Sequence, residues 1–358
     1  MRFHLALPIL GLAACVDEPS LSTSGDQLRR RTPVLTSQQS GVTGRLQSIA
    51  PVDDNTVWVS GVNGTVLRTT DGGATWERHV VPGAETLAFR DIHAVDERTA
   101  WVLTNNGGPN ARIYKTIDAG ATWTLEFTSP IANTFYDCFA FWSPNRAIAV
   151  PDAENGRFDA IRMTDGHTWE NIGDEFPPGQ VGEGLFPTSG NCVTTFGGHR
   201  AWAVLAGANP SRVVATDDDG DTWASYPIPI AGGPTGGGMN VRFRDPHHGI
   251  VSGGDVTQPT VPQINFARTH DGGRTWDHAT STPFPGAAYG LSFVPGDDNC
   301  AAAVFAAGPS GAAWSADEGD TWQPIDGATT GYFSVEMASR HRGWLVGAGG
   351  AITRIDLE

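Results

Sequence analysis

The sequence predicts an all-β protein, a seven-bladed β-propeller of four-stranded antiparallel blades that occupies residues 32–358. The first reason is composition: 45 Gly, 24 Pro and 12 Trp with only 17% charged residues indicate many short strands joined by tight turns. The second is an eight-residue motif that recurs at the length of one blade. The third is the C-terminal unit, which lacks an outer strand that residues 32–37 can supply. Together these observations predict a closed ring.

Two segments precede the predicted propeller. Residues 1–14 are typical of a secretory signal peptide, because the short n-region of residues 1–4 is followed by a mostly apolar run at residues 5–14 that is too short to span a bilayer. The run ends in Leu12-Ala13-Ala14-Cys15, which resembles the bacterial lipobox and predicts lipidation of Cys15. The alternative is a plain signal peptide with a chance cysteine. Residues 15–31 are polar and predict a lipidated tether. We therefore expect an exported, membrane-anchored lipoprotein in the periplasm or on the cell surface.

The recurring motif has the pattern S/T-x-D-x-G-x-x-W and resembles the Asp-box, or BNR repeat. Complete copies occupy residues 69–76, 116–123, 216–223, 269–276 and 315–322, and a shortened copy occupies 164–169. The box aspartates and tryptophans are Asp71, Trp76, Asp118, Trp123, Asp165, Trp169, Asp218, Trp223, Asp271, Trp276, Asp317 and Trp322. Successive aspartates lie 46 to 53 residues apart, which suits four strands and their turns. Each copy therefore predicts one blade.

The residue types of the box are those of a hairpin turn. An aspartate accepts hydrogen bonds from nearby backbone N–H groups, glycine adopts positive φ, and tryptophan covers the turn with apolar area. In families with this box the turn lies between the outer strands of a blade, away from the central channel. We therefore expect the box residues to be structural rather than catalytic.

A short strand with an apolar or aromatic centre precedes each box. In the first blade, residues 56–61 lead through a turn into 65–68 and then the box. Equivalent strands lie at residues 100–102, 147–149, 201–203, 249–251 and 343–345. The last unit has strands at 333–337, 343–346 and 351–355 but no box, so residues 32–37 are predicted to complete it. Six boxed units and this composite unit make seven blades.

Two of the four cysteines occupy equivalent places in neighbouring blades. Cys138 and Cys192 both fall on predicted first strands, at the same offset from Arg146 and Arg200. A disulfide between them is plausible in an exported protein. The alternative is a pair of buried thiols, since equivalent strands of adjacent blades can lie beyond the roughly 7 Å limit for bridging. The sequence leaves both possibilities open.

Charge and residue spacing exclude several classes of function. The net charge of −16 disfavours binding to nucleic acid. No His or Cys set has metal-ligand spacing, and no phosphate loop follows a strand, so neither metal nor cofactor is expected. In propellers, function usually lies on the loops and inner strands that line the channel. These stretches contain the binding candidates Arg45, Arg90, Asp91, Tyr136, Asp137, Asn191, Asn240, Arg242, Tyr289 and Glu336. The alternative is that they are ordinary solvated loop residues.

The aromatic-centred strand, Gly-x-x-Gly turn and box of residues 57–76 resemble the photosystem II stability/assembly factor family. The resemblance covers almost the whole chain after the tether. It implies a seven-bladed propeller without known catalysis that binds partner proteins during assembly of membrane complexes. The chain departs from the photosynthetic members in lacking an evident basic surface. We therefore expect a monomeric, lipid-anchored scaffold that binds a protein or peptide, with a membrane complex as one candidate partner.

The alternative function is that of a glycoside hydrolase or a sialidase-like enzyme acting on surface glycans, because such enzymes also carry the Asp-box. A sialidase clamps a carboxylate with several arginines and uses a tyrosine nucleophile. The early Arg-Ile-Pro motif of sialidases is absent, and sialidases have six blades. A two-carboxylate glycosidase would use Asp137 and Glu336, which nothing in the sequence brings together. The sequence therefore favours binding over catalysis.

Overall fold

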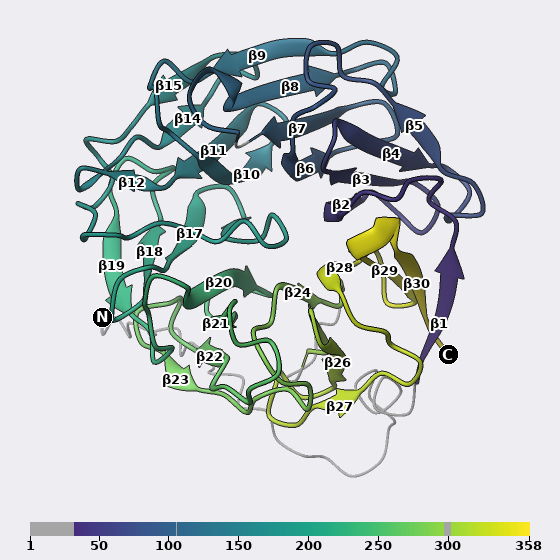
Figure 1. Ribbon diagram of the computed structural model, residues 1–358. Helices are drawn as coiled ribbons and strands as arrows, with labels where there is room; N and C mark the ends of the chain where they lie inside the picture. Colours follow the sequence, from purple (N-terminus) through teal and green to yellow (C-terminus); the bar gives the residue numbers. More distant parts are fainter. Residues whose placement is uncertain (1–31, 105, 297–301) are drawn as a thin grey trace, which may run out of the picture.

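The computed structural model describes residues 32–104, 106–296 and 302–358. Across these residues, seven four-stranded antiparallel sheets are arranged around a central axis as the blades of a propeller, as predicted (Figure 1). The predicted signal peptide, the tether and Cys15 lie outside the described residues. No helix within the described ranges has the length and apolarity needed to cross a membrane.

Blades 1 to 3 each run from an inner strand outward. Blade 1 contains β2 (Leu46–Pro51), β3 (Val57–Gly61), β4 (Thr65–Thr69) and β5 (Glu77–His79). Blade 2 contains β6 (Phe89–Ala94), β7 (Ala100–Thr104), β8 (Arg112–Thr116) and β9 (Thr124–Thr128). Blade 3 contains β10 (Tyr136–Ser143), β11 (Arg146–Pro151), β14 (Ile161–Met163) and β15 (Trp169–Asn171). A small hairpin of β12 (Ala153–Glu154) and β13 (Arg157–Phe158) is inserted in blade 3.

Blades 4 to 7 repeat this order. Blade 4 contains β16 (Val193–Phe196), β17 (Arg200–Leu205), β18 (Arg212–Thr216) and β19 (Ala224–Pro227). Blade 5 contains β20 (Gly236–Phe243), β21 (Gly249–Asp255), β22 (Phe266–Thr269) and β23 (Asp277–His278). Blade 6 contains β24 (Gly290–Phe293), β25 (Val304–Gly308), β26 (Gly311–Ser315) and β27 (Gln323–Pro324). Blade 7 contains β28 (Tyr332–Met337), β29 (Arg342–Gly347), β30 (Ile352–Leu357) and β1 (Pro33–Gln38).

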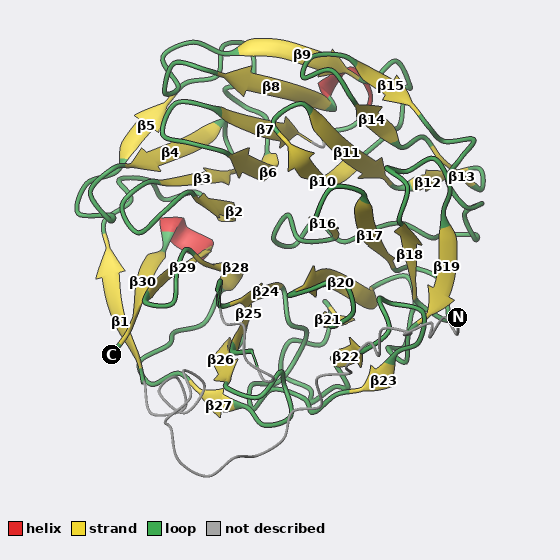
Figure 2. Cartoon of the chain, turned by 180° about the vertical axis from the view of Figure 1, so that it is seen from behind, coloured by secondary structure: helices red, strands yellow, loops and turns green. Residues whose placement is uncertain are grey.

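Helical structure is confined to two short 3₁₀ turns in the described part of the chain, η1 (Gly108–Asn110) and η2 (Ala348–Gly350) (Figure 2). The rest of the ring consists of strands and turns, as the glycine and proline content predicts.

The N-terminal strand closes the ring. β1 pairs antiparallel with β30 from Pro33 opposite Leu357 to Gln38 opposite Ile352, and the two strands lie side by side in Figure 1. The last blade therefore contains both ends of the described chain. This confirms the predicted closure, with β1 placed one residue later than expected.

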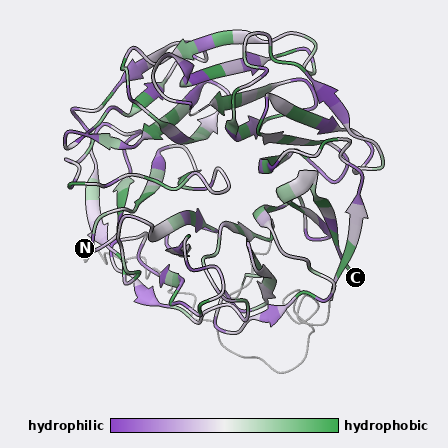
Figure 3. Cartoon of the chain, viewed as in Figure 1, coloured by the Kyte–Doolittle hydropathy of each residue, from purple (hydrophilic) through white to green (hydrophobic). Residues whose placement is uncertain are grey.

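Buried second strands hold neighbouring blades together. Every residue of β3 and of β7 is buried, because both faces of a blade are covered by its neighbours. Trp58, Trp101, Trp202 and Trp344 are each at most 2% exposed. Two of these indoles donate to the adjacent blade: Trp58 Nε1 to the Asp96 carbonyl (3.3 Å) and Trp202 Nε1 to the Gly272 carbonyl (2.9 Å). Hydrophilic residues are concentrated on outer strands such as β5, β23 and β27 (Figure 3).

The first box shows how the motif forms its turn. The Thr75 N–H and hydroxyl donate to the two Asp71 carboxylate oxygens at 2.9 and 2.7 Å, and the Gly73 N–H donates to Thr69 Oγ1 at 2.9 Å. Gly73 has φ of 83°, a conformation that favours glycine. The other complete boxes repeat the bond from the threonine N–H to the aspartate, at Asp118, Asp218, Asp271 and Asp317. Each turn joins the two outer strands of its blade, so the boxes are scaffold.

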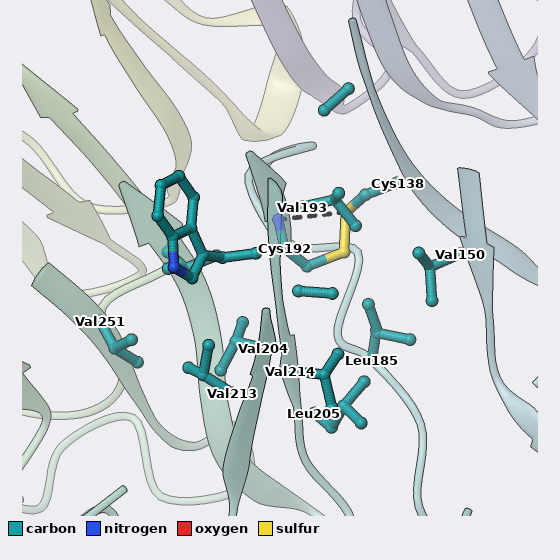
Figure 4. Packing of buried hydrophobic residues seen from close by; sticks show 14 of the residues in the cluster. Cys138, Val150, Leu185, Cys192, Val193, Val204, Leu205, Val213, Val214 and Val251 are labelled. Carbon is teal, nitrogen blue, oxygen red and sulfur yellow. Dashed lines mark hydrogen bonds between the residues drawn. A yellow bond between two sulfur atoms is a disulfide. The ribbon is translucent and has the colours of Figure 1, made fainter. Parts of the chain in front are cut away.

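A disulfide joins Cys138 on β10 to Cys192, which immediately precedes β16. Their Cα atoms are 5.9 Å apart, within bridging distance, because the inner strands converge toward the axis. Figure 4 shows the bridge in the hydrophobic packing between blades 3 and 4, which includes Val150, Leu185 and Val193. Of the two possibilities left open by the sequence, the structure contains the bridge.

Candidate functional site

The inner strands carry a repeated β-bulge near the end at which they begin. In five of the seven described blades, one residue of the inner strand is skipped in the pairing with the second strand: Gln47, Arg90, Asp137, Met239 and Phe333. Bulges re-aim side chains and are common beside functional sites. We call the end of the axis where the inner strands begin the strand-start mouth; it comprises Arg45, Arg90, Asp137, Tyr289 and Phe333.

Arg45 is a half-buried cation at the strand-start mouth. Its guanidinium lies over the Phe333 ring, 5.0 Å from the centroid, and the Phe333 ring lies 5.4 Å from that of Tyr289. Its Nε is buried, and no group in the described ranges forms a hydrogen bond or an ion pair with this side chain. Burial lowers the pKa of Arg45, and the nearby Tyr289 acts in the opposite direction. Two aromatic rings thus support a cation whose donors remain available.

A second arginine lies close to the first. Burial lowers the pKa of Arg90, the positive charge of Arg45 lowers it further, and Asp137 raises it. Arg90 also approaches Gln47, with 3.4 Å between Nη1 and Oε1. Asp137 is 2% exposed and hydrogen-bonded to Asp152, whose pKa is raised by burial. The strand-start mouth therefore places two partly desolvated arginines beside the buried acid pair of Asp137 and Asp152.

A cavity of about 250 Å³ lies further along the axis, lined by Asp91, His93, Asn191, Arg242 and Glu336 among others. Arg242 Nη2 donates to Glu336 Oε2 at 2.5 Å and to Asn191 Oδ1 at 2.6 Å. Burial raises the pKa of Glu336, and the charge of Arg242 opposes that shift. The His93 ring stacks on Phe141 with centroids 4.2 Å apart, and burial lowers its pKa to about 4, so this histidine is neutral near pH 7. Arg242 is thus engaged inside the protein.

The two carboxylates of the glycosidase hypothesis lie at different levels of the ring. Glu336 lines the 250 Å³ cavity, whereas Asp137 is not among its lining residues and lies at the strand-start mouth. Glu336 is paired with Arg242 and Asp137 is hydrogen-bonded to Asp152. Neither carboxylate faces the other across a common space.

Three predicted binding residues are engaged in packing between blades. Asn240 is fully buried; its amide nitrogen donates to Ser252 and to the Ala288 carbonyl, and its oxygen accepts from Ser189 at 2.6 Å. The Tyr136 hydroxyl donates to the Asp159 carbonyl at 2.8 Å, and its ring is 1% exposed.

Asp91 is the third, at 3% exposed. It accepts from the Ser48 hydroxyl, the Ile92 N–H and the Phe139 N–H at 3.0, 2.8 and 3.0 Å, which joins blades 1, 2 and 3. All ten candidates therefore lie on or beside inner strands, but they separate into a mouth group, an internal ion-pair group and these packing residues.

Sequence reasoning missed Gln47, Met239 and Phe333. Each lies eleven residues before the buried centre of its second strand, as Arg90 does before Trp101 and Asp137 before Ile148. Asn191 has the same spacing from Trp202. This constant spacing identifies the bulge residues from the sequence, because each lies eleven positions before the centre of a second strand.

Comparisons with known proteins agree with the fold and with the repeat. Residues 21–166 match the family model described as photosynthesis system II assembly factor YCF48. A photosystem II assembly protein Ycf48 from Synechococcus sp. (strain JA-2-3B'a(2-13)) is 24% identical over 276 residues, 66% of this chain and 75% of the relative. A photosystem II assembly lipoprotein Ycf48 from Synechococcus sp. (strain CC9902) is 26% identical over 236 residues, 62% of this chain, and the match spans only 57% of that relative.

Solved structures have the same architecture. A structure described as YCF48 bound to D1 peptide superimposes with a TM-score of 0.61 at 17% identity, covering 91% of this chain and 97% of the other. YCF48 from Cyanidioschyzon merolae gives a TM-score of 0.64 at 18% identity, with coverages of 90% and 98%. At these identities the structural likeness establishes the fold alone. The chain is therefore a seven-bladed propeller, and its sequence is similar to that of the YCF48 photosystem II assembly factors.

Proposed function

We propose that this protein is an exported, lipid-anchored scaffold that binds a protein or peptide partner at the strand-start mouth and has no catalytic activity. The observation that carries the proposal is Arg45, a half-buried guanidinium that lies over Phe333 without an internal hydrogen bond or ion pair in the described structure. The Nε of Arg45 is buried without an acceptor, whereas its Nη groups are not among the buried atoms, so a ligand carboxylate can bond to the guanidinium through them.

The chemistry of the mouth favours an acidic group on the partner. The positive charge of Arg45 lowers the pKa of Arg90, and a carboxylate bound between the two guanidiniums would relieve that repulsion. The surrounding aromatic rings of Tyr289 and Phe333 favour an apolar neighbour of that carboxylate. The solved relative whose description records a bound D1 peptide supports a peptide as the ligand.

The location part of the proposal has separate support. The Cys138–Cys192 disulfide is expected in an oxidising compartment, which agrees with export. One relative is named a lipoprotein, which agrees with lipidation of Cys15. Mass spectrometry of the mature protein purified from membranes should find Cys15 as a lipidated N-terminus. An unmodified Cys15 would refute the anchor.

Partner capture from solubilised membranes tests the binding site. Arg45→Ala and Arg90→Ala should each weaken binding of the captured partner at least tenfold, roughly 1.4 kcal/mol. The matched control is Arg98→Ala, which removes the same charge from an exposed turn on the opposite end of the blades. Arg242→Ala should lower stability rather than binding, because Arg242 is paired with Glu336. Binding that is unchanged in both mouth variants would exclude the mouth.

The hydrolase alternative has no supporting observation of its own, because Asp137 and Glu336 are separately engaged. Incubation with a panel of glycosides and sialosides provides the decisive measurement. If the purified protein hydrolyses one of these substrates and Glu336→Gln abolishes the activity, the protein is an enzyme and the scaffold proposal is wrong.

A further inference from the structure

A cation recurs on the third strand of the blades, directly opposite the buried centre of the second strand. The register pairs Arg68 with Trp58, Lys115 with Trp101, Arg162 with Ile148, Arg268 with Ile250 and Arg354 with Trp344. We call such a residue the seam cation, the seam being the interface between one blade and the next. Five of the seven described blades have one.

Four seam cations contact the following blade. Arg68 lies over the Trp58 ring at 5.5 Å and donates to the Glu97 carbonyl at 2.9 Å. Lys115 lies over the Trp101 ring at 4.7 Å and donates to the Gly166 carbonyl at 3.1 Å. Each cation therefore covers its own blade and binds an acceptor in the neighbour.

The remaining two of these four seam cations pair with a carboxylate in the box of the next blade. Arg162 contacts Asp221 at 2.6 Å, and Arg268 contacts Asp320. Asp221 and Asp320 both lie three residues after their box aspartate. In blades 4 and 6 this box position therefore supplies the partner of the seam cation from the preceding blade, whereas blades 1 and 2 have Ala74 and Ala121 there.

The seam between blades 4 and 5 lacks both members of this pair. Opposite Trp202 the third strand carries Ala215, and the box position in blade 5 is Arg274. A cavity of about 150 Å³ lies at this seam, lined by Ala215 and Arg274 among others. The other exception, Trp314 of blade 6, places its own ring opposite Phe305. The vacant seam position is thus open only between blades 4 and 5 among the seams described.

The walls of this cavity, which we call the seam recess, carry a defined set of groups. Trp223 and Tyr226 are half-buried aromatic residues, and Trp202, which is buried, also lines the cavity. Arg200 and Arg274 line the recess and each donates one bond to a backbone carbonyl, of Pro246 and Asp271 respectively, at 2.8 and 2.9 Å. Asp217 and Thr222 are exposed lining residues. Two guanidiniums that form no ion pair with any described carboxylate thus line an aromatic-walled space.

We propose that the seam recess binds a sugar ring that carries a carboxylate, such as a hexuronic acid. The carboxylate takes the place that the guanidiniums of Arg162 and Arg268 occupy at other seams, with the charges reversed, and interacts with Arg274 and Arg200. The ring packs on Trp223 or Tyr226, and its hydroxyls donate to Asp217 and exchange hydrogen bonds with Thr222. The site is separate from the strand-start mouth and does not depend on the proposed partner binding.

The aromatic walls select this ligand over an acidic peptide side chain. A carboxylate alone would contact only the arginines and would not contact Trp223, Tyr226 or Asp217. The net charge of −16 also disfavours a polyanionic protein surface, whereas a single uronate adds one charge.

Calorimetric titration of the full chain with sodium glucuronate, glucose and a glutamate-containing tripeptide tests this proposal. We expect saturable binding of glucuronate with a dissociation constant of about 1 mM or tighter, and at least tenfold weaker binding of glucose. Arg274→Ala should weaken glucuronate binding at least tenfold. Ala215→Glu should abolish it, because the new carboxylate fills the recess and pairs with Arg274.

Arg98→Ala is the control, with the same loss of charge at an exposed turn elsewhere; it should bind glucuronate as the wild type does. Thermal unfolding of each variant shows whether the ring is intact. Absence of saturable glucuronate binding, equal binding of glucose, stronger binding of the tripeptide, or unchanged binding in Arg274→Ala and Ala215→Glu would each overturn the proposal.

Discussion

The residues that follow the bulges form a series of ties around the axis. Ser48 donates to Asp91 across blades 1 and 2, and Cys138 is bonded to Cys192 across blades 3 and 4. Asn240 occupies the equivalent position in blade 5 and links it to blade 6 through the Ala288 carbonyl. One position of the repeat thus holds a carboxylate, a disulfide or an amide, each of which joins two blades. These residues stabilise the ring that presents the mouth.

Replacing Asp91 tests this interpretation at a single residue. Asp91→Ala removes the acceptor of three donors from three blades and leaves the buried N–H groups of Ile92 and Phe139 without their partner. We expect a loss of roughly 2–3 kcal/mol in the free energy of unfolding, measured by chemical denaturation. Ser48→Ala, which removes one donor, should cost about 1 kcal/mol. Equal, small losses in both variants would contradict a central role for the carboxylate.

The box aspartates predict a defined acid sensitivity. Hydrogen bonds from the Thr75 N–H and hydroxyl lower the pKa of Asp71 to about 2 from an ordinary value of 3.8. A carboxyl with a depressed folded pKa contributes stability above pH 4, and that contribution disappears as the pH falls toward 2.

Asp71→Asn should therefore lower stability at pH 6 by at most about 1 kcal/mol, because the group is exposed, and the difference from wild type should shrink between pH 4 and pH 2. Chemical denaturation of both proteins at pH 6, 4 and 2.5 measures this difference in the free energy of unfolding. A difference that stays constant with pH would show that the charge of Asp71 does not contribute.

Among the elements, the inner strands of blades 3 and 4 are joined covalently. β10 carries Cys138, and Cys192 directly precedes β16; the bridge closes a loop with a sequence separation of 54 residues. Restricting a loop of this length in the unfolded chain stabilises the fold by roughly 2–4 kcal/mol.

Cys138→Ala/Cys192→Ala should therefore lower the free energy of unfolding by roughly that amount. When unfolding is measured in the presence of dithiothreitol, the free energy of unfolding should fall for the wild type and should not change for the double variant. If the free energy of unfolding of the wild type is the same with and without reductant, the bridge is not formed in the protein.

For the whole molecule, closure depends on a strand that comes from the opposite end of the chain. β1 pairs with β30 over six residues, and Leu35 packs against the hydrophobic cluster of blades 6 and 7. Without β1, β30 becomes an unpaired edge that can pair with another molecule.

Removing residues 1–38 should lower the unfolding temperature by about 10 °C or more and cause aggregation, because the ring is opened. Removing residues 1–31 alone should leave the unfolding temperature and the oligomeric state unchanged. Light scattering and thermal unfolding of the two truncated proteins distinguish the cases. Equal stability of both would contradict closure by β1.

Local pattern and spacing determined the fold of this protein. The box forms its turn from residues at most seven positions apart, so the turn can be predicted without any tertiary information. The eleven-residue interval between bulge and second strand is equally local, as with Phe333 and Trp344. Because each blade repeats one local plan, counting the repeats and the missing outer strand was sufficient to predict seven blades and their closure.

Only the tertiary structure decided how the candidate residues are used. Arg45 and Arg242 are both arginines near inner strands, yet Arg45 lies over Phe333 and Arg242 pairs with Glu336 from two blades away. Asn240 and Asn191 differ similarly, one tied to the neighbouring blade and the other holding Arg242. Such pairings join residues about 50 to 290 positions apart, so they depend on how side chains converge at the axis and not on any local pattern. For this reason the scaffold can be predicted from the sequence, whereas the arrangement of the site residues is known only from the closed ring.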